Sequence, residues 1–262
     1  MREEIDRVIR AMQALKDLVP SGGLRNLDQV ISEMDGMISP EFQPYFLANT
    51  ALSLLFVCDR CGRCCREEKV IAVTIEDCRR IARYLGVSLK RFMKDYTRPH
   101  ELKSELVGSA RMLKKAPGES CPFYDPALPG CRIHSAKPQV CIAALYLSKM
   151  NLLICEEQKK VNRFPICSAD GKMRARIAEL SSRIKGDAGA KKQLDQLFEG
   201  ARDEAELFHL LLRLKGMQIY FGDERATLLA RRLGLARVPG DKEMRGAALL
   251  YALEITGLMI DN

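Results

Sequence analysis

Four thiols within eight residues constrain this chain more than any other feature of its sequence. The run reads Cys58-Asp59-Arg60-Cys61-Gly62-Arg63-Cys64-Cys65, with the spacing C-x2-C-x2-C-C. Two-residue gaps allow consecutive thiolates to converge on one centre, and Gly62 permits the tight turn that this requires. The first three cysteines match the opening of the ligand runs in bacterial ferredoxins. Because neighbouring side chains diverge, the pair Cys64 and Cys65 indicates a multi-iron cluster, two metals, or one ligand beside a spare thiol.

A second group of cysteines follows at wider spacing. It consists of Cys121, Cys131, Cys141, Cys155 and Cys167. The first three lie in or beside residues 116–140, a segment rich in proline and glycine that we expect to be a loop with little regular backbone pairing. Four cysteines complete a structural zinc site or a 4Fe-4S cluster, so the run and the second group are together enough for two centres.

The compartment decides how these cysteines are interpreted. The first residues are charged and pass directly into helical periodicity, which is unlike an export signal. The longest apolar stretches, residues 52–58 and 247–260, are too short or too interrupted to span a bilayer. We therefore expect a cytoplasmic protein with no membrane span. In a reducing compartment, cysteines at short spacing are more often metal ligands or catalytic groups than disulfides.

Positive charge is concentrated on the cysteine-bearing segment. The formal net charge is +8, and residues 58–168 contain 21 Lys and Arg against 12 Asp and Glu. Such an excess attracts nucleic acid, or it offsets the negative charge that thiolates carry when they bind metal. We favour charge compensation and expect no nucleic-acid partner, because the sequence lacks the aromatic and basic interleaving of single-strand binders.

The rest of the sequence predicts a mainly α-helical fold. Apolar residues recur at helical spacing over residues 3–19 and 26–37, and a third helix is expected from Pro44 toward Leu55. Further elements are expected over residues 70–73 (extended), 74–86, from Ser88 onward, and over 172–185, 190–200, 203–215, 224–233 and 242–259. We expect a small irregular cysteine-rich metal-binding module in the middle. It divides the chain into N-terminal helices (1–53), the module (54–168) and a C-terminal helical bundle (169–262).

Several short stretches of this module share their order and local context with a known family. They are Phe56-Val57-Cys58, Arg60-Cys61-Gly62-Arg63-Cys64-Cys65, Cys121-Pro122-Phe123, Cys131-Arg132-Ile133-His134 and Lys137-Pro138-Gln139-Val140-Cys141, together with the helix expected over residues 74–86. They resemble the CxxCxxCC cysteine-cluster proteins, also called YkgJ-like and described as zinc- or iron-chelating. The chain departs from that family in having Ile142-Ala143-Ala144-Leu145 where an Arg and a Phe-Pro are usual, and His134 where a Tyr is usual. Either Cys155 or Cys167 corresponds to the last cysteine of the family pattern.

The resemblance implies a metal or iron–sulfur centre, in agreement with the thiol spacing. We expect eight cysteines as metal ligands: Cys58, Cys61, Cys64, Cys65, Cys121, Cys131, Cys141 and Cys167. The number of thiols and the ferredoxin-like gaps favour an iron–sulfur cluster, 4Fe-4S in particular, with zinc as the alternative. Cys78 lies on the apolar face of its helix and is expected in the core. For His134 we expect packing rather than ligation, because such a histidine more often packs or caps.

Three classes of function follow from these residues and from the resemblance. The first is an iron–sulfur protein that transfers electrons or handles metal together with a protein or redox partner. The second is an enzyme that modifies proteins, since the resemblance includes lysine methylases that act on flagellin. The third is a zinc-stapled interaction module. The sequence carries no motif that decides whether the chain is an enzyme.

Overall fold

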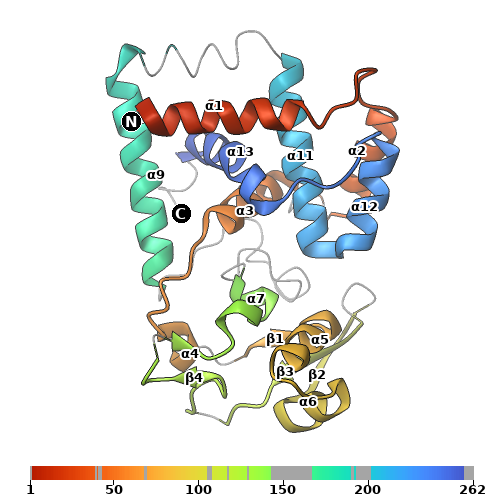
Figure 1. Ribbon diagram of the computed structural model, residues 1–262, viewed down its shortest axis with the longest axis vertical. Coiled ribbons are helices and arrows are strands. Elements are labelled where there is room, and N and C mark those ends of the chain that lie inside the picture. Colours follow the sequence, from red (N-terminus) through yellow and green to blue (C-terminus); the bar gives the residue numbers. More distant parts are fainter. Residues whose placement is uncertain are drawn as a thin grey trace. The chain divides into compact units, whose positions relative to one another are not determined.

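The computed structural model describes residues 2–38, 40, 43–67, 70–104, 108–116, 118–128, 130–142, 167–189, 192 and 202–256. These residues form two compact units. The helical unit comprises the described residues up to Leu55 and from Met173 onward, and the cysteine unit comprises those from Phe56 to Lys172. Helices dominate over a few short strands (Figure 1), so the expected mainly α-helical fold is confirmed. The division into residues 1–53, 54–168 and 169–262 stays a prediction.

The helical unit is built almost entirely from the helices that apolar periodicity predicts. They are α1 (Arg2–Lys16), α2 (Leu27–Gly36), α3 (Gln43–Leu55), α9 (Ser168–Gly186, which begins in the cysteine unit), α11 (Arg202–Phe221), α12 (Asp223–Arg232) and α13 (Asp241–Glu254). Helix α13 packs against α1 and α3, and α11 packs against α3 and α12. The helix expected over residues 190–200 lies mostly outside the described residues. Within the described ranges, no helix has the length and apolar character needed to cross a membrane.

Two glycines allow the helices of this unit to approach closely. A Cβ atom at Gly216 of α11 would lie 2.5 Å from the ring of Phe46 in α3, and one at Gly246 of α13 would lie 2.7 Å from the Cβ of Ala11 in α1. Tyr220, one turn after Gly216, is buried and stacks on Phe46 with a centroid distance of 5.3 Å. Close backbone approach and the burial of large rings therefore hold α1, α3, α11 and α13 around one core.

The cysteine unit combines short helices with two small sheets. Its elements are α4 (Arg63–Glu67), β1 (Ala72–Val73), α5 (Ile75–Tyr84), α6 (Leu89–Tyr96), β2 (Thr97–Ser104), β3 (Gly108–Leu113), β4 (Tyr124–Asp125), β5 (Gly130–Cys131), the 3-10 helix η1 (His134–Ala136) and α7 (Gln139–Ile142). Strand β3 is the centre of an antiparallel sheet of order β1-β3-β2, with Val73 opposite Arg111 and Thr97 opposite Leu113. The expected extended stretch is present as β1, whereas the β2–β3 hairpin is a feature that the sequence pattern does not predict.

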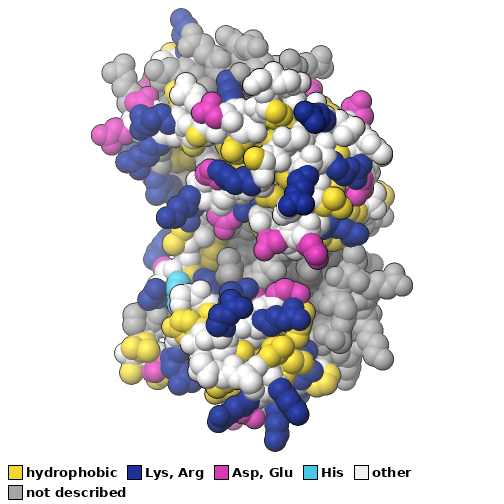
Figure 2. All heavy atoms as spheres, turned by 45° about the vertical axis from the view of Figure 1, so that its right-hand side comes forward, with side chains coloured by type: hydrophobic (Ala, Val, Ile, Leu, Met, Phe, Trp, Pro, Cys, Tyr) yellow, Lys and Arg dark blue, Asp and Glu magenta, His cyan; other side chains and the backbone are white. Residues whose placement is uncertain are grey.

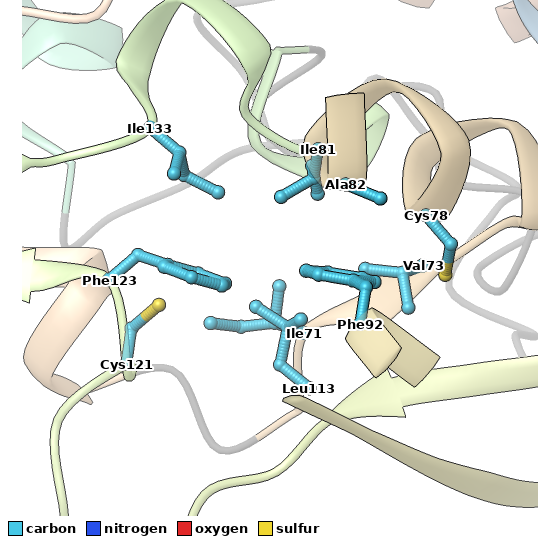
Figure 3. Close-up of a cluster of buried hydrophobic side chains, with 10 residues drawn as sticks. All are labelled: Ile71, Val73, Cys78, Ile81, Ala82, Phe92, Leu113, Cys121, Phe123 and Ile133. Atoms are coloured by element: carbon cyan, nitrogen blue, oxygen red, sulfur yellow. The ribbon is translucent and has the colours of Figure 1, made fainter. Parts of the chain in front are cut away.

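Local sequence explains how α5 begins and what it packs against. The hydroxyl of Thr74 accepts a hydrogen bond from the N–H of Asp77, whose carboxylate accepts one from the N–H of Thr74, as the predicted helix start requires. Cys78 of α5 lies in a core cluster with Phe92 of α6 and Phe123 of the later loop (Figure 3). The rings of Phe92 and Phe123 stack with their centroids 6.3 Å apart. This core therefore joins α5 and α6 to the segment that carries the second group of cysteines.

Candidate metal centre

One cavity in the cysteine unit is lined by thiols from separate parts of the sequence. Its volume is about 70 Å³. The cysteines that line it are Cys58, Cys61, Cys64, Cys65, Cys121, Cys131, Cys141 and Cys167. These are the eight cysteines expected as ligands, so the fold brings the whole expected set to one place. Leu113, Phe123 and Ile133 of the core cluster form part of the same wall.

The cysteine run turns tightly before it enters α4. Arg60 and Gly62 both have positive φ, 58° and 72°. The backbone N–H of Arg60 donates a hydrogen bond to Sγ of Cys58, with an N···S distance of 3.4 Å. The turn that Gly62 was expected to permit is therefore present, and it directs an amide hydrogen at the first thiol. A left-handed conformation at a residue with a side chain costs about 1–2 kcal/mol, so Arg60 is held there by its surroundings.

The hairpin of β4 and β5 packs directly on this turn. Its two strands pair Tyr124 with Cys131. A Cβ atom at Gly130 would lie 2.8 Å from the carbonyl oxygen of Arg60, and one at Gly62 would lie 2.6 Å from the ring of Tyr124. Only a residue without a side chain fits at these two close approaches. Two glycines therefore allow the turn and the hairpin to meet, and the contact brings Cys131 to the cysteine run.

Further hydrogen bonds tie α4 to the later loop. The backbone N–H of Cys121 donates to the carbonyl oxygen of Cys65 at 2.7 Å. The guanidinium of Arg66 donates to the hydroxyl of Tyr124 at 2.7 Å, and its Cζ lies 5.4 Å from the centroid of that ring. This hydrogen bond is the largest cause that raises the pKa of Arg66. Together these contacts place Cys121 beside the cysteine run.

Asp77 links α5 to the start of α7, which carries Cys141. Its side chain is 2% exposed, and its Oδ1 accepts hydrogen bonds from the guanidinium of Arg80 and, at 3.1 Å, from the backbone N–H of Gln139. Arg80 also donates to the carbonyl oxygen of Lys137 at 2.8 Å. Because charge-assisted hydrogen bonds are the strong ones, this pair fixes the turn that leads to Cys141.

Asp59 ties the cysteine run to the first turn of α9, which follows Cys167. Its Oδ2 accepts hydrogen bonds from the hydroxyl of Ser168 at 2.6 Å and from Nζ of Lys172 at 3.0 Å. Its Oδ1 accepts from the backbone N–H of Cys61 at 3.3 Å. The hydrogen bond from Ser168 is the largest cause that lowers the pKa of Asp59 to about 2, and Lys172 adds to it while burial opposes it. The ionised carboxylate therefore holds Cys61 and Cys167 on the same cavity.

Backbone amides donate hydrogen bonds to several of these sulfurs. The pairs of acceptor and donor are Cys58 with Arg60, Cys121 with Phe123, Cys131 with Ile133, and Cys167 with both Ala169 and Asp170. In each pair the donor follows its cysteine by two or three residues. A hydrogen bond to the charged form of a group favours that form, so this repeated arrangement suits sulfurs that bind metal as thiolates.

Burial keeps four of these thiols, those of Cys121, Cys131, Cys141 and Cys167, protonated at neutral pH unless a metal replaces the proton. It is the first cause that raises the pKa of Cys121 to about 11, the pKa of Cys141 well above its ordinary value, and the pKa of Cys131 and Cys167. Negative charge on Cys64 raises the pKa of all four further. Cys64 therefore lies near thiols that come from distant segments. Because metal ligands must lose their protons, binding at this cavity depends on pH.

The donor set and the size of the cavity suit a thiolate-bound metal. One water molecule needs about 10–15 Å³ of cavity volume, so the cavity has room for roughly five water molecules. That is more than one metal ion occupies. Among the described residues, no group of three or more His, Cys, Asp or Glu side chains is already arranged to hold an ion. Bringing the sulfurs onto a metal therefore takes changes of cysteine rotamer, which are available to thiols that line one cavity.

The other candidates from the sequence lie elsewhere, with one exception. Cys78 is buried in the core cluster as predicted, and burial raises its pKa to about 11. Figure 3 shows it at the opposite end of the cluster from Cys121. Cys155 lies outside the described residues. The exception is His134, which was expected to pack and which lines the cavity. That the eight cysteines bind metal stays a prediction.

Three residues that position the site were not identified from the sequence. Asp59 had a signal, because an aspartate often accepts a hydrogen bond from the amide two residues on. Asp77 falls in the helix expected over residues 74–86, and its bond to Gln139 depends on the tertiary fold. Tyr124 had no signal, because its contacts with Gly62 and Arg66 join distant segments.

Positive charge borders the cavity. Arg60 and Lys137 are among the residues that line the cavity. On the face shown in Figure 2, the described Lys and Arg side chains are interspersed with acidic and uncharged ones. The cations at the cavity are in place to offset thiolate charge, as the compensation hypothesis requires.

A cavity lined by cysteines from separate segments, with amide donors at the sulfurs, is the architecture of a cysteine-cluster metal-binding domain. Residues 57–168 match the family model CxxCxxCC, whose description reads "Putative zinc- or iron-chelating domain". This segment therefore matches the CxxCxxCC family, and the resemblance noted in the sequence is confirmed. No curated protein and no solved structure matches the chain significantly.

Proposed function

We propose that the protein is an iron–sulfur protein that exchanges electrons with a protein partner. The observation that carries the proposal is the cavity where the cysteine run meets the later cysteines. A structural zinc site takes four ligands, whereas this cavity has eight thiols and room for several atoms. Surplus thiols and volume favour a cluster over a single ion.

The chain's own residues set the properties of such a centre. A bound cluster supplies a reversible one-electron site. The amide hydrogens of Phe123 and Ile133 donate to sulfurs, and Arg60 and Lys137 bring positive charge to the same wall. Both effects stabilise added negative charge, so both raise the reduction potential.

One observation favours metal handling as a second candidate function. Cys61 is exposed although it lines the cavity. An exposed ligand thiol is open to exchange with thiols of another protein. The protein-methylating and zinc-stapled classes stay predictions, since no contact among the described residues favours either. The cytoplasmic location also stays a prediction.

Anaerobic purification tests the proposal. The 262-residue chain is analysed for iron, zinc and acid-labile sulfide, and is then reduced stepwise while electron paramagnetic resonance spectra are recorded. Iron and sulfide in similar stoichiometric amounts, with a reversible one-electron signal, support the proposal. Colourless protein with stoichiometric zinc overturns it. Iron that leaves on reduction and is recovered in an added metal-free acceptor protein establishes metal handling instead.

A further inference from the structure

His134 lines the thiol-lined cavity and carries an unsatisfied ring nitrogen. It is the first residue of η1, three residues after Cys131, and its side chain is among those that line the cavity. Its Nε2 atom is buried and has no hydrogen-bond partner among the described residues. Buried polar atoms are nearly always paired, and an ion is one of the few explanations for an exception.

The surroundings keep this imidazole in the form that binds metal. Burial is the first cause that lowers the pKa of His134, and the positive charges of Lys137 and Arg60 lower it further. The ring is therefore neutral at neutral pH. A neutral imidazole offers a nitrogen lone pair, and it is a common ligand of both iron and zinc.

We propose that Nε2 of His134 is a ligand of the metal in this cavity, so that the centre is bound by cysteine thiolates and one imidazole nitrogen. The proposal rests on the proposed function, because it takes a metal to be present. It deepens that function in one respect. Imidazole is uncharged whereas thiolate is negative, so a mixed ligand set holds a less negative centre, which has a higher reduction potential than one bound by thiolates alone.

A histidine of the helical unit provides a matched control. His209 is 42% exposed, and its Nε2 lies 3.5 Å from the carboxylate of Glu254. It does not line the cavity. The variants His134→Leu and His209→Leu therefore each remove one imidazole, but only the first removes the nitrogen proposed to bind metal.

X-ray absorption at the edge of the bound metal tests the assignment in anaerobically purified protein. We expect one nitrogen among the sulfur ligands of the wild type, at about 2.0–2.1 Å against about 2.3 Å for sulfur if the metal is zinc. The nitrogen should persist in His209→Leu and disappear in His134→Leu, whose reduction potential should also be lower if the metal is iron. Wild-type protein whose metal has only sulfur ligands overturns the inference and leaves the proposed function standing.

A second measurement needs no substitution, and so does not depend on the folding of His134→Leu. Wild-type protein labelled with ¹⁵N-histidine is reduced, and electron spin echo spectra are recorded for hyperfine coupling to the label. Strong ¹⁵N coupling supports ligation by Nε2. In protein whose reduced metal is paramagnetic, coupling that is absent or weak, as an N–H donor to sulfur would give, overturns the inference, and for diamagnetic zinc the X-ray absorption measurement decides. Protein that contains no metal overturns both proposals.

Discussion

The backbone N–H of Cys121 donates a hydrogen bond to the carbonyl oxygen of Cys65, with an N···O distance of 2.7 Å. This bond joins the end of the cysteine run to the first cysteine of the later loop. It uses main-chain atoms alone, so replacing either side chain leaves both partners in place. A Cys→Ser variant at the cavity that loses metal therefore reports a lost ligand more than a displaced loop.

The close approach of Gly130 to Arg60 predicts that Gly130→Ala is strongly destabilising. The new Cβ would lie 2.8 Å from the carbonyl oxygen of Arg60, at a residue whose φ is +89°. Left-handed strain and the displaced backbone together should lower the free energy of unfolding by about 3 kcal/mol. Metal content should fall as well, because the hairpin that carries Cys131 packs on this contact. Denaturant unfolding and metal analysis measure the two effects.

Gly118→Ala separates the cost of left-handed strain from the cost of displacing the backbone. Gly118 also has a positive φ, +80°, but a Cβ there would meet nothing within 4 Å. Only the conformational cost of about 1 kcal/mol should remain, with metal content unchanged. Equal losses in the two variants would show that the contact between Gly130 and Arg60 contributes nothing.

The hydrogen bonds of Asp77 predict that Asp77→Asn weakens both the fold and the site. Asn has one acceptor oxygen and an amide nitrogen that only donates, so it cannot accept both the bonds that Oδ1 receives from Arg80 and Gln139 and the bond that Oδ2 receives from Thr74. Loss of a buried charged acceptor should cost about 2–4 kcal/mol of unfolding free energy and loosen the turn before Cys141. Glu76→Gln, a neighbouring exposed change, should cost no more than about 0.5 kcal/mol. Similar values for the two variants would contradict the linking role of Asp77.

Much of the fold is visible in the sequence because helices depend on local pattern. Neighbouring residues predict the start of α5 at Thr74 and the helices α1 and α2, and the structure confirms these elements. Strands β2 and β3 had no such signal. The pair of Thr97 with Leu113 buries residues at the ends of the strands, and the sequences of the two strands show no clear alternation of apolar and polar residues. The hairpin depends on pairing with distant β1 rather than on its own pattern.

In the candidate site, too, local sequence predicts some features, whereas others depend on contacts between distant residues. Thiol spacing predicted a shared centre, and the fold does place Cys58 and Cys167 on one cavity. The link through Asp59 and Ser168, by contrast, joins residues from opposite ends of the module. Neither residue type nor spacing encodes such a contact, because it exists only after the chain has packed. The same holds for the unpaired Nε2 of His134, whose burial no local pattern reveals.

The pH dependence of stability should reveal an ion pair at the start of α13. The hydrogen bonds from Arg237 are the first cause that lowers the pKa of Glu243 from 4.5 to about 2, and the N–H of Gly240 adds to them. A lowered folded-state pKa means stability that is present above the ordinary pKa and lost as the pH falls from about 4.5 to 2. Since the Glu243 side chain is 37% exposed, solvent reduces its contribution to about 1 kcal/mol.

Glu243→Gln should therefore destabilise the protein by about 1 kcal/mol at pH 7 and by almost nothing near pH 2. Comparing variant with wild type at each pH cancels any loss of metal that acid causes in both. Glu224→Gln, at an exposed position in the first turn of α12, is the control, because it removes a carboxylate without removing this ion pair. A difference that stays constant with pH would contradict the ion pair. Metal content should be the same in all three proteins at pH 7, because Glu243 lies in the helical unit.

The position of Cys64 predicts that it is the most sensitive of the eight expected ligands. Its charge raises the pKa of Cys121, Cys131, Cys141 and Cys167, so its sulfur lies near all four. Cys64→Ser should lower the metal affinity by at least about tenfold, since a hydroxyl is a poor substitute for a thiolate and even indirect contacts of a metal site have effects of that size. Competition with a chelator at several pH values measures the affinity.

Cys78→Ser is the matched control for that experiment. Cys78 is buried, and burial raises its pKa to about 11, but it lies in the core cluster and does not line the cavity. A buried hydroxyl should cost about 1–2 kcal/mol of stability without any loss of metal. Cys65→Ser then shows whether the second thiol of the adjacent pair is a ligand or a spare. If Cys78→Ser loses as much metal as Cys64→Ser, metal retention follows general stability, and the cavity is not the binding site.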